Sequence, residues 1–124
     1  MKRKTVLSLA AVLFALIFAG CNIQIMYSGT DINGNVSGSY KLFSGTKNKT
    51  IHVKEGNPVE VKYSSKLKKG ELTMTIYDSN NNIVYELETN KSGTKLLKAD
   101  KDEEYKLEIV GDGAEGSFSV KWNN

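Results

Sequence analysis

The sequence predicts an all-β protein: an antiparallel β-sandwich, of jelly-roll or immunoglobulin-like type, with about seven to nine strands. Two observations support this fold class. Apolar and polar residues alternate with a period of two in several short segments, as they do in strands with one buried face. Clusters of Gly, Asn and Asp separate these segments, and no segment after residue 21 has a sustained helical period.

The first twenty residues differ from the rest and are left out of the fold prediction. Lys2, Arg3 and Lys4 form a basic start, and residues 6–18 are apolar apart from Ser8. This apolar run is shorter than the roughly 20 residues that a spanning helix needs. A basic start, a short apolar run and small residues before a cleavage point are typical of a secretory signal peptide, so residues 1–20 are expected to be removed.

The end of this segment resembles a known processing site. The residues Phe18-Ala19-Gly20-Cys21 resemble the lipobox of bacterial lipoproteins, in which the cysteine receives a diacylglycerol thioether and the chain is cut before it. The resemblance implies a lipid-anchored protein on the extracytoplasmic face of the cell membrane. An ordinary signal peptide followed by a chance cysteine is the alternative. Cys21 is the only cysteine, so no intramolecular disulfide is expected.

The net charge of +3 comes from the signal segment alone. Without Lys2, Arg3 and Lys4 the chain has fourteen Lys and Arg against fourteen Asp and Glu. A neutral chain argues against a nucleic-acid binder, which needs a basic surface. It also argues against electrostatic binding of the domain itself to a membrane.

Three turns and a series of alternating segments organise the remaining chain. The turns are 55–58, 78–82 and 111–116. The expected strands are 51–53, 59–63, 72–77, 83–87, 105–109 and 118–122, with weaker ones at 40–43 and 94–98. Residues 21–38 are expected to hold the lipidated Cys21 and either a tether or a first strand, with 23–27 as the candidate strand and 28–39 as a Gly, Ser, Thr and Asn-rich tether. The sandwich domain is expected to span residues 39–124.

Most aromatic residues fall on the side of the strands that faces inward. They are Tyr63, Tyr85, Tyr105, Phe118 and Trp122. Burying several of these side chains would supply a core without disulfides.

Residues 39–122 resemble a group of small, uncharacterised lipoproteins of Gram-positive bacteria. The segments that carry the resemblance are 38–40, 53–56, 63–66 and 116–122. These lipoproteins are expected to form β-sandwiches similar to bacterial pre-peptidase C-terminal domains. The resemblance implies no catalytic residues and leaves the function open.

Catalysis is not expected. His52 is the only histidine and lies in outward phase, where a solvated side chain is far more common than a catalytic base. Ser64, Ser65 and Ser79 lie outside any G-x-S-x-G motif, and Cys21 is expected to carry lipid. One histidine without a free thiol does not make a zinc site.

Calcium is the metal that the sequence leaves open. Asp100, Asp102, Glu103 and Glu104 cluster before one expected strand, and calcium binds clustered carboxylate oxygens. Interleaved lysines favour a solvated acidic turn instead, so the expectation is no cofactor besides the lipid on Cys21.

Carbohydrate is the ligand that the sequence leaves open. β-Sandwiches can bind sugars on exposed aromatic rings, and Tyr77 and Tyr40 are the candidates, with Phe43 or Tyr27 as further ones. The leading hypothesis is a membrane-anchored, non-catalytic interaction or structural module with a protein or cell-wall glycan partner and no nucleic acid. The alternative is a glycan or cell-wall polymer binding module, stabilised by calcium in one version.

Overall fold

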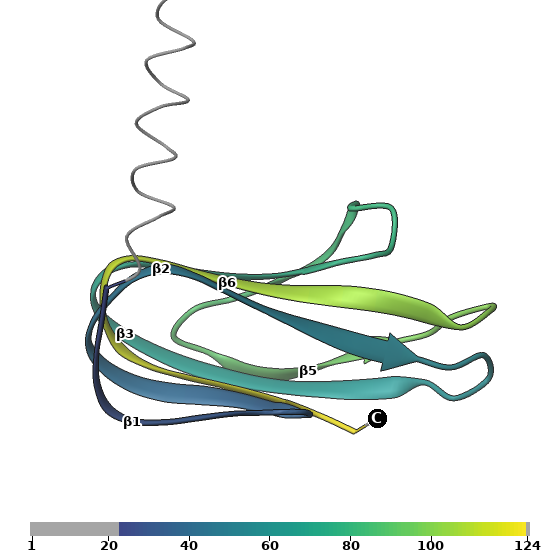
Figure 1. Ribbon diagram of the computed structural model, residues 1–124, viewed down its shortest axis with the longest axis horizontal. Coiled ribbons are helices and arrows are strands. Elements are labelled where there is room, and N and C mark those ends of the chain that lie inside the picture. The colour runs from purple at the N-terminus through teal and green to yellow at the C-terminus, as the bar shows by residue number, and fades with distance from the viewer. Residues whose placement is uncertain (1–22, 124) are drawn as a thin grey trace, which may run out of the picture.

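A computed structural model describes residues 23–123, and this part of the chain is all-β (Figure 1). The expected signal peptide and Cys21 lie outside the described residues. The strands are β1 (Ile23–Ile32), β2 (Asn35–Val53), β3 (Val59–Tyr77), β4 (Ile83–Leu87), β5 (Ser92–Leu97) and β6 (Glu103–Trp122). Among these residues there is no helix long and apolar enough to cross a membrane.

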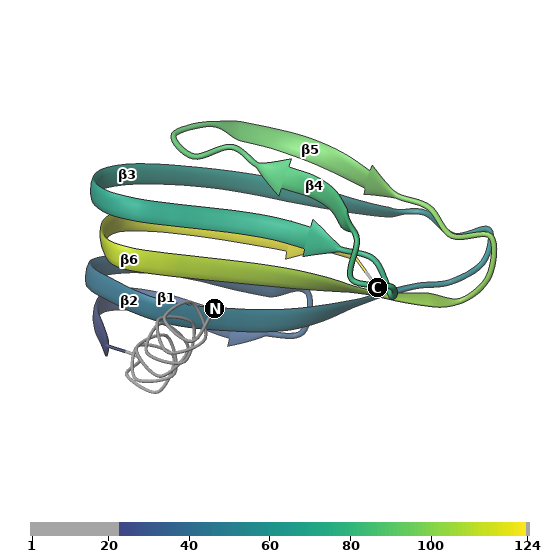
Figure 2. The same cartoon turned by 90° about the horizontal axis from the view of Figure 1, so that it is seen from above.

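The strands form one antiparallel sheet that folds over on itself. The order is β1-β2-β6-β3-β4, with β5 paired to β3. The long strands β2, β3 and β6 each bend midway, and the bends gather at one end of the molecule (Figure 1, left; Figure 2). The first layer holds β1, β5 and residues 35–43, 59–67 and 114–122. The second layer holds β4 and residues 45–53, 71–77 and 103–111.

This architecture confirms the all-β, antiparallel prediction and corrects the strand count. Residues 23–123 form six strands, fewer than the expected seven to nine, because segments predicted as separate strands are halves of one strand. Residues 40–43 and 51–53, for example, both belong to β2. The expected turn at 111–116 is the bend inside β6, where the chain changes layer without leaving the sheet. Counted by halves, the layers have five and four strand segments.

Glycine makes the bends possible by letting backbones touch. The register between β3 and β6 shifts on both sides of Lys69, as it does at β-bulges. Gly70 has a φ of 76°, and a Cβ there would overlap the carbonyl group of Gly113. Gly116 has a φ of 153°, and a Cβ there would overlap the carbonyl oxygen of Lys66. Side chains at these positions would force the two bends apart.

The N-terminal hairpin settles the alternatives for residues 23–27. Ile23–Ile32 is strand β1, and the dipeptide Asn33-Gly34 joins it to β2. Residues 28–39 are therefore not a tether, and the sheet begins before residue 39. Of the two connecting residues only Gly34 has a positive φ, 85°, a conformation that glycine adopts without the steric cost of a side chain. The carbonyl oxygen of Gly34 accepts a 2.9 Å hydrogen bond from the backbone N–H of Trp122.

The core lies between the layers and is rich in aromatic rings. Four of the five aromatic residues expected there are buried, and Tyr85 is partly buried against them. Tyr40 and Phe43 join the core near the bends. The Tyr40 ring stacks on Phe43 and Phe118, with ring centroids 5.1 Å and 5.3 Å apart. Such pairs add to the stability that area burial gives.

An ion cluster bridges the layers at the edge formed by β1 and β2. Asp31 of β1 pairs with Lys49 at 2.7 Å and with Lys47 at 3.8 Å, both from the second-layer half of β2. The hydrogen bond that Lys49 donates holds the pKa of Asp31 below its ordinary value. A charge turned inward on an edge strand also discourages pairing with another sheet.

Gly70→Ala should destabilise the protein far more than Gly56→Ala. The two glycines have nearly equal φ angles, 76° and 74°, but a Cβ at Gly56 meets nothing within 4 Å. Gly56→Ala therefore carries only the left-handed backbone cost of about 1 kcal/mol. Gly70→Ala adds the backbone overlap, and we expect a loss of about 3 kcal/mol or more in urea denaturation. Equal losses would contradict the role given to the bend.

Asp31→Asn should lower the free energy of unfolding at neutral pH by about 0.5–1 kcal/mol, since the carboxylate is half exposed and its pairing is screened by water. Because the pKa of Asp31 is lowered in the folded state, the stabilisation exists above the unfolded pKa, close to 3.8, and is lost as the pH falls through the lower folded value. Denaturation of both proteins at pH 7 and pH 2 measures this. A difference that persists at pH 2 would rule out the carboxylate as its source.

Candidate functional site

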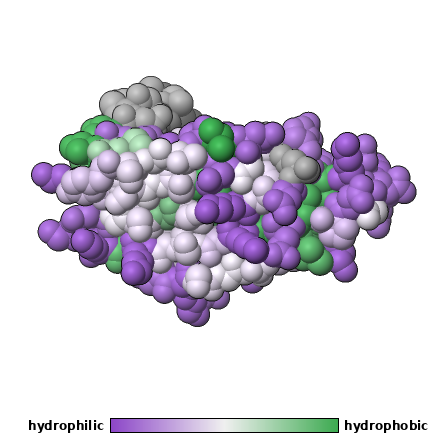
Figure 3. Space-filling view, turned by 90° about the horizontal axis from the view of Figure 1, so that it is seen from below, coloured by the Kyte–Doolittle hydropathy of each residue, from purple (hydrophilic) through white to green (hydrophobic). Residues whose placement is uncertain are grey.

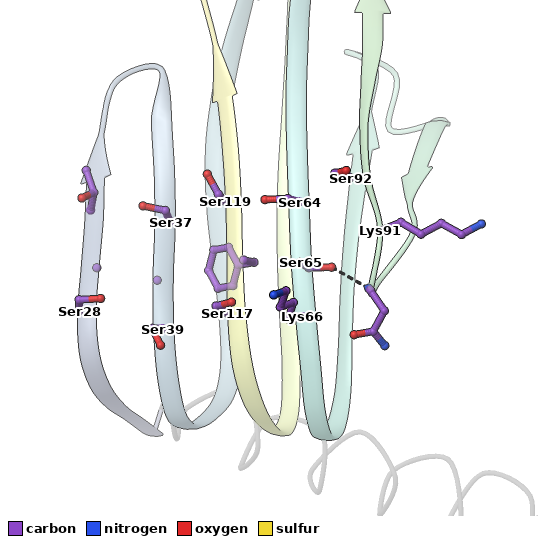
Figure 4. Close-up of a pocket in the computed structure, with 15 residues that line it drawn as sticks. Ser28, Ser37, Ser39, Ser64, Ser65, Lys66, Lys91, Ser92, Ser117 and Ser119 are labelled. Carbon is purple, nitrogen blue, oxygen red and sulfur yellow. Dashed lines mark hydrogen bonds between the residues drawn. The ribbon is translucent and has the colours of Figure 1, made fainter.

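Two rows of hydroxyl side chains cross the outer face of the first layer. Period-two alternation places Ser37 and Ser39 outward because Val36 and Tyr40 face the core. Neighbouring strands continue both rows in register, as Figure 4 shows. The first row is Thr30, Ser37, Ser119, Ser64 and Ser92, and the second is Ser28, Ser39, Ser117 and Lys66. We call this surface the hydroxyl face.

The hydroxyl face is hollowed. A depression of about 770 Å³ lies over the two rows. Its floor is formed by the short side chains of the two rows. Between the rows, Gly29 and Gly38 pair with each other and face the core. On the inner side the ring of Tyr40 lies against Gly38 and the Met26 side chain lies against Gly29, so large side chains support the sheet there. Figure 3 views this face, where pale, weakly polar residues cover a broad area.

A short loop forms one wall of the depression. Asn90 has a φ of 59°, and its Oδ1 accepts a 2.7 Å hydrogen bond from the backbone N–H of Leu67. The hydroxyl of Ser65 accepts a 3.1 Å hydrogen bond from the N–H of Asn90. The N–H of Ser65 donates to the carbonyl oxygen of Lys91, also at 3.1 Å. These bonds fix the loop to β3 and give buried Ser65 its partners.

Lysines make the hydroxyl face positive. No Asp or Glu lines the depression within the described residues, whereas Lys66 and Lys91 do. Lys91 pairs with Glu88 at 2.5 Å and extends away from the rows (Figure 4). One row further along, Lys62 and Lys121 lie directly opposite each other on adjacent strands. Like charges in that arrangement repel, and the ion pair that Lys62 forms with Glu60 at 3.7 Å offsets only part of this repulsion.

The opposite outer face carries the complementary charge. Glu86, Glu104 and Glu108 face outward on the second layer, with Lys106 among them. The chain after residue 4 is neutral overall, with fourteen Lys and Arg against fourteen Asp and Glu, but its two outer faces carry opposite net charges. The argument from net charge against electrostatic binding holds for the whole chain but not for the hydroxyl face taken alone.

The two tyrosines predicted as ligand contacts do not form one site. Tyr40 is not outward, which corrects that prediction: it is 3% exposed, because it continues the inward phase of Val36. Phe43 is fully buried. Tyr27, on the contrary, is 71% exposed and lies beside Ser39 and Lys66 at the edge of the hydroxyl face.

Tyr77 lies on the outer face of the second layer. Its hydroxyl lies 3.4 Å from Glu108 Oε1, and Lys106 Nζ lies 5.0 Å from its ring centroid. Burial and, next to it, the charge of Glu108 raise the pKa of Tyr77. Within residues 23–123 it is the one outward-facing aromatic side chain of that layer, so no row of rings accompanies it.

The four acidic residues considered for calcium point to different partners. Asp102 Oδ1 accepts a 2.9 Å hydrogen bond from the N–H of Glu55. Glu103 Oε2 accepts a 3.4 Å bond from the N–H of Ser79, and Glu104 pairs with His52 at 3.3 Å. Asp100 is exposed. The described residues contain no group of three or more His, Cys, Asp or Glu side chains placed for one metal ion.

The sequence contained part of the signal for the hydroxyl face. Ser and Thr alternate at 28, 30, 37, 39, 117 and 119, a pattern equally typical of a strand and of a polar tether. These residues form one surface only because the strand register places Ser119 between Ser37 and Ser64. Residues 64 and 119 are far apart in the chain, so no local pattern reveals their pairing.

Comparisons with known proteins identify no family. No family model matches the chain, and no curated protein matches it. One solved structure that resembles it is a mitogen derived from Yersinia pseudotuberculosis, with a TM-score of 0.38 and 9% identity over 64% of this chain and 86% of that one. A likeness this weak transfers no function. The resemblance to Gram-positive lipoproteins stays a prediction.

Lys121→Gln should raise the stability of the protein, whereas Lys106→Gln should lower it. The first change removes repulsion from Lys62, and the second removes a cation that lies among glutamates on the same strand. We expect shifts of roughly 0.2–1 kcal/mol in opposite directions. Urea denaturation at low and high salt measures them, and both shifts should shrink as salt screens the charges. A destabilised Lys121→Gln protein would show that Lys121 has a structural role.

Proposed function

We propose that this protein is an exported lipoprotein whose folded domain is a non-catalytic binding module on the extracytoplasmic side of the cell membrane. The observation that carries the binding role is the hydroxyl face. Its serines and threonines come from five strands, lie in register around a depression, and serve no need of the core. Each of these hydroxyls both donates and accepts hydrogen bonds, so a block of them can bind a polar ligand.

The anchor rests on the resemblance of residues 18–21 to a lipobox, and the position of β1 is compatible with it. Ile23 pairs with Ser44 at the bend end of the sandwich. Two residues span at most about 7 Å, so a lipid on Cys21 would hold this end close to the bilayer. Ile23, Ile25 and Met26 are exposed at the same end and would contact the membrane interface. The hydroxyl face would then extend away from the membrane along the strands.

Cys21→Ser should abolish lipid attachment, because serine has no thiol to form the thioether. We expect the variant either in the medium or as an uncut precursor. Fractionation of cells together with the intact mass of the protein checks both outcomes. Retention in the membrane at normal levels with a normally cut N-terminus would contradict the anchor.

The binding role is tested by photo-crosslinking in cells. A crosslinking amino acid at position 119 lies in the centre of the hydroxyl face, and one at position 75 lies on the outer face of the second layer as a matched control. We expect one species, protein or polymer, to be captured from position 119 and not from position 75. Equal capture from both positions, or none from either, would contradict a binding role for this face.

A further inference from the structure

We propose that the hydroxyl face binds an extended anionic polyol: a linear polymer of hydroxylated units joined by phosphodiesters, lying along β3 and β6. The proposal rests on the proposed binding function and names its ligand. Three properties of the surface support it: the composition of its lining, the spacing of its cations, and the shape of its depression.

The lining suits hydroxylated chains better than it suits a protein surface. Protein interfaces are enriched in aromatic residues, Met and Arg, and depleted in Ser and Lys. The depression has the reverse composition, with serines, one threonine, Asn90 and two lysines, and Phe118 as its one aromatic lining residue. Each serine hydroxyl both donates and accepts hydrogen bonds, so rows of them match a ligand whose groups also do both.

The cations are placed for separated anionic groups. Lys66 and Lys62 are four residues apart on β3, about 13 Å along the strand, and Ser64 lies between them. Lys121 stands beside Lys62 on β6. Lys66 and Lys121 form no ion pair within residues 23–123. Lys62 also pairs with Glu60 at 3.7 Å, so Lys121 is the cation of this pair without an ion partner among the described residues. A phosphate between Lys62 and Lys121 would offset their repulsion, and hydroxylated units would cover the serines before a later phosphate meets Lys66.

The shape favours a chain over a single ion. A depression of about 770 Å³ that crosses all five strand segments is far larger than one phosphate. Tyr27 and Lys68 continue the surface beyond Lys66 towards the bends, beside Ser39 and Ser117. Glu115 also lines this end, so Lys66 and Lys68 outnumber it there by two to one. A ligand that runs from Lys62 and Lys121 to Lys66 and Lys68 contacts serine hydroxyls between these two pairs of lysines.

The test measures binding of the full lipidated protein, in detergent micelles, to a synthetic oligo(glycerol phosphate). We expect tighter binding to this probe than to polyphosphate of equal charge, because polyphosphate has no hydroxylated units for the serines. Binding should weaken with salt, as it does for contacts to phosphate. Equal or tighter binding of polyphosphate would overturn the proposal, since charge alone would then explain the binding.

Variants locate the site. Lys62→Gln combined with Lys121→Gln should weaken binding about tenfold or more, because charge-assisted hydrogen bonds are the strongest contacts available here. Ser64→Ala combined with Ser119→Ala should weaken it severalfold. Lys106→Gln combined with Thr75→Ala changes the same strands on the opposite face and should leave binding unchanged. Equal losses in the control would overturn the proposal.

A conservative variant separates charge from fold. Lys62→Arg keeps the cation and should keep binding within about twofold, while thermal unfolding establishes that every variant folds. Binding only to vesicles that contain phosphatidylglycerol, or equally to single-stranded nucleic acid, would assign the face to another ligand and overturn the proposal. Crosslinking of a protein from position 119, with no binding of the oligomer, would overturn this ligand while leaving the binding module standing.

Discussion

The close contact of backbones at the three bends is the constraint on which the rest of the structure depends. One sheet can cover its own apolar face only if all its long strands turn at the same place. At Gly70 and Gly116 that turn brings backbone against backbone, with no room for a side chain. Because β2, β3 and β6 bend together, their halves stay in register in both layers, and the core forms between them.

The same constraint creates the hydroxyl face. Once the bends fix the register of the first layer, serines on β2, β6 and β3 lie side by side whatever their distance in sequence. Between the two rows, Gly29 and Gly38 face inward, and the side chains of Met26 and Tyr40 lie against them. Aromatic rings that cover glycines in this way restore packing that the missing side chains would lose. The depression is therefore supported from within.

What the sequence could predict was local, and what it could not predict was long-range. Alternation around Val61, Met74 and Leu107 correctly predicted strands, because one buried face imposes a period of two. The strand count was wrong because bulges and glycine bends inside a strand have the same composition as turns. Tyr40 was placed outward because no strong alternation covered residues 40–43, and the register shift that follows it was invisible. The hydroxyl face needed pairings between distant residues.

Charge on the two outer faces also follows from the fold and explains a local cost. A chain with equal numbers of acids and bases can place opposite charges next to each other on one face, as it does with Lys106 and Glu108, two residues apart on β6. Lys62 and Lys121 instead lie opposite each other on adjacent strands. Glu60 pairs with Lys62 at 3.7 Å, and Lys121 forms no ion pair among residues 23–123. The inward charge of Asp31 and the bulge near Met26 protect the β1 edge from pairing with other sheets. The Lys62–Lys121 repulsion therefore remains on the hydroxyl face, while the β1 edge is protected from pairing. This distribution is expected of a surface that binds an anionic ligand rather than another sheet.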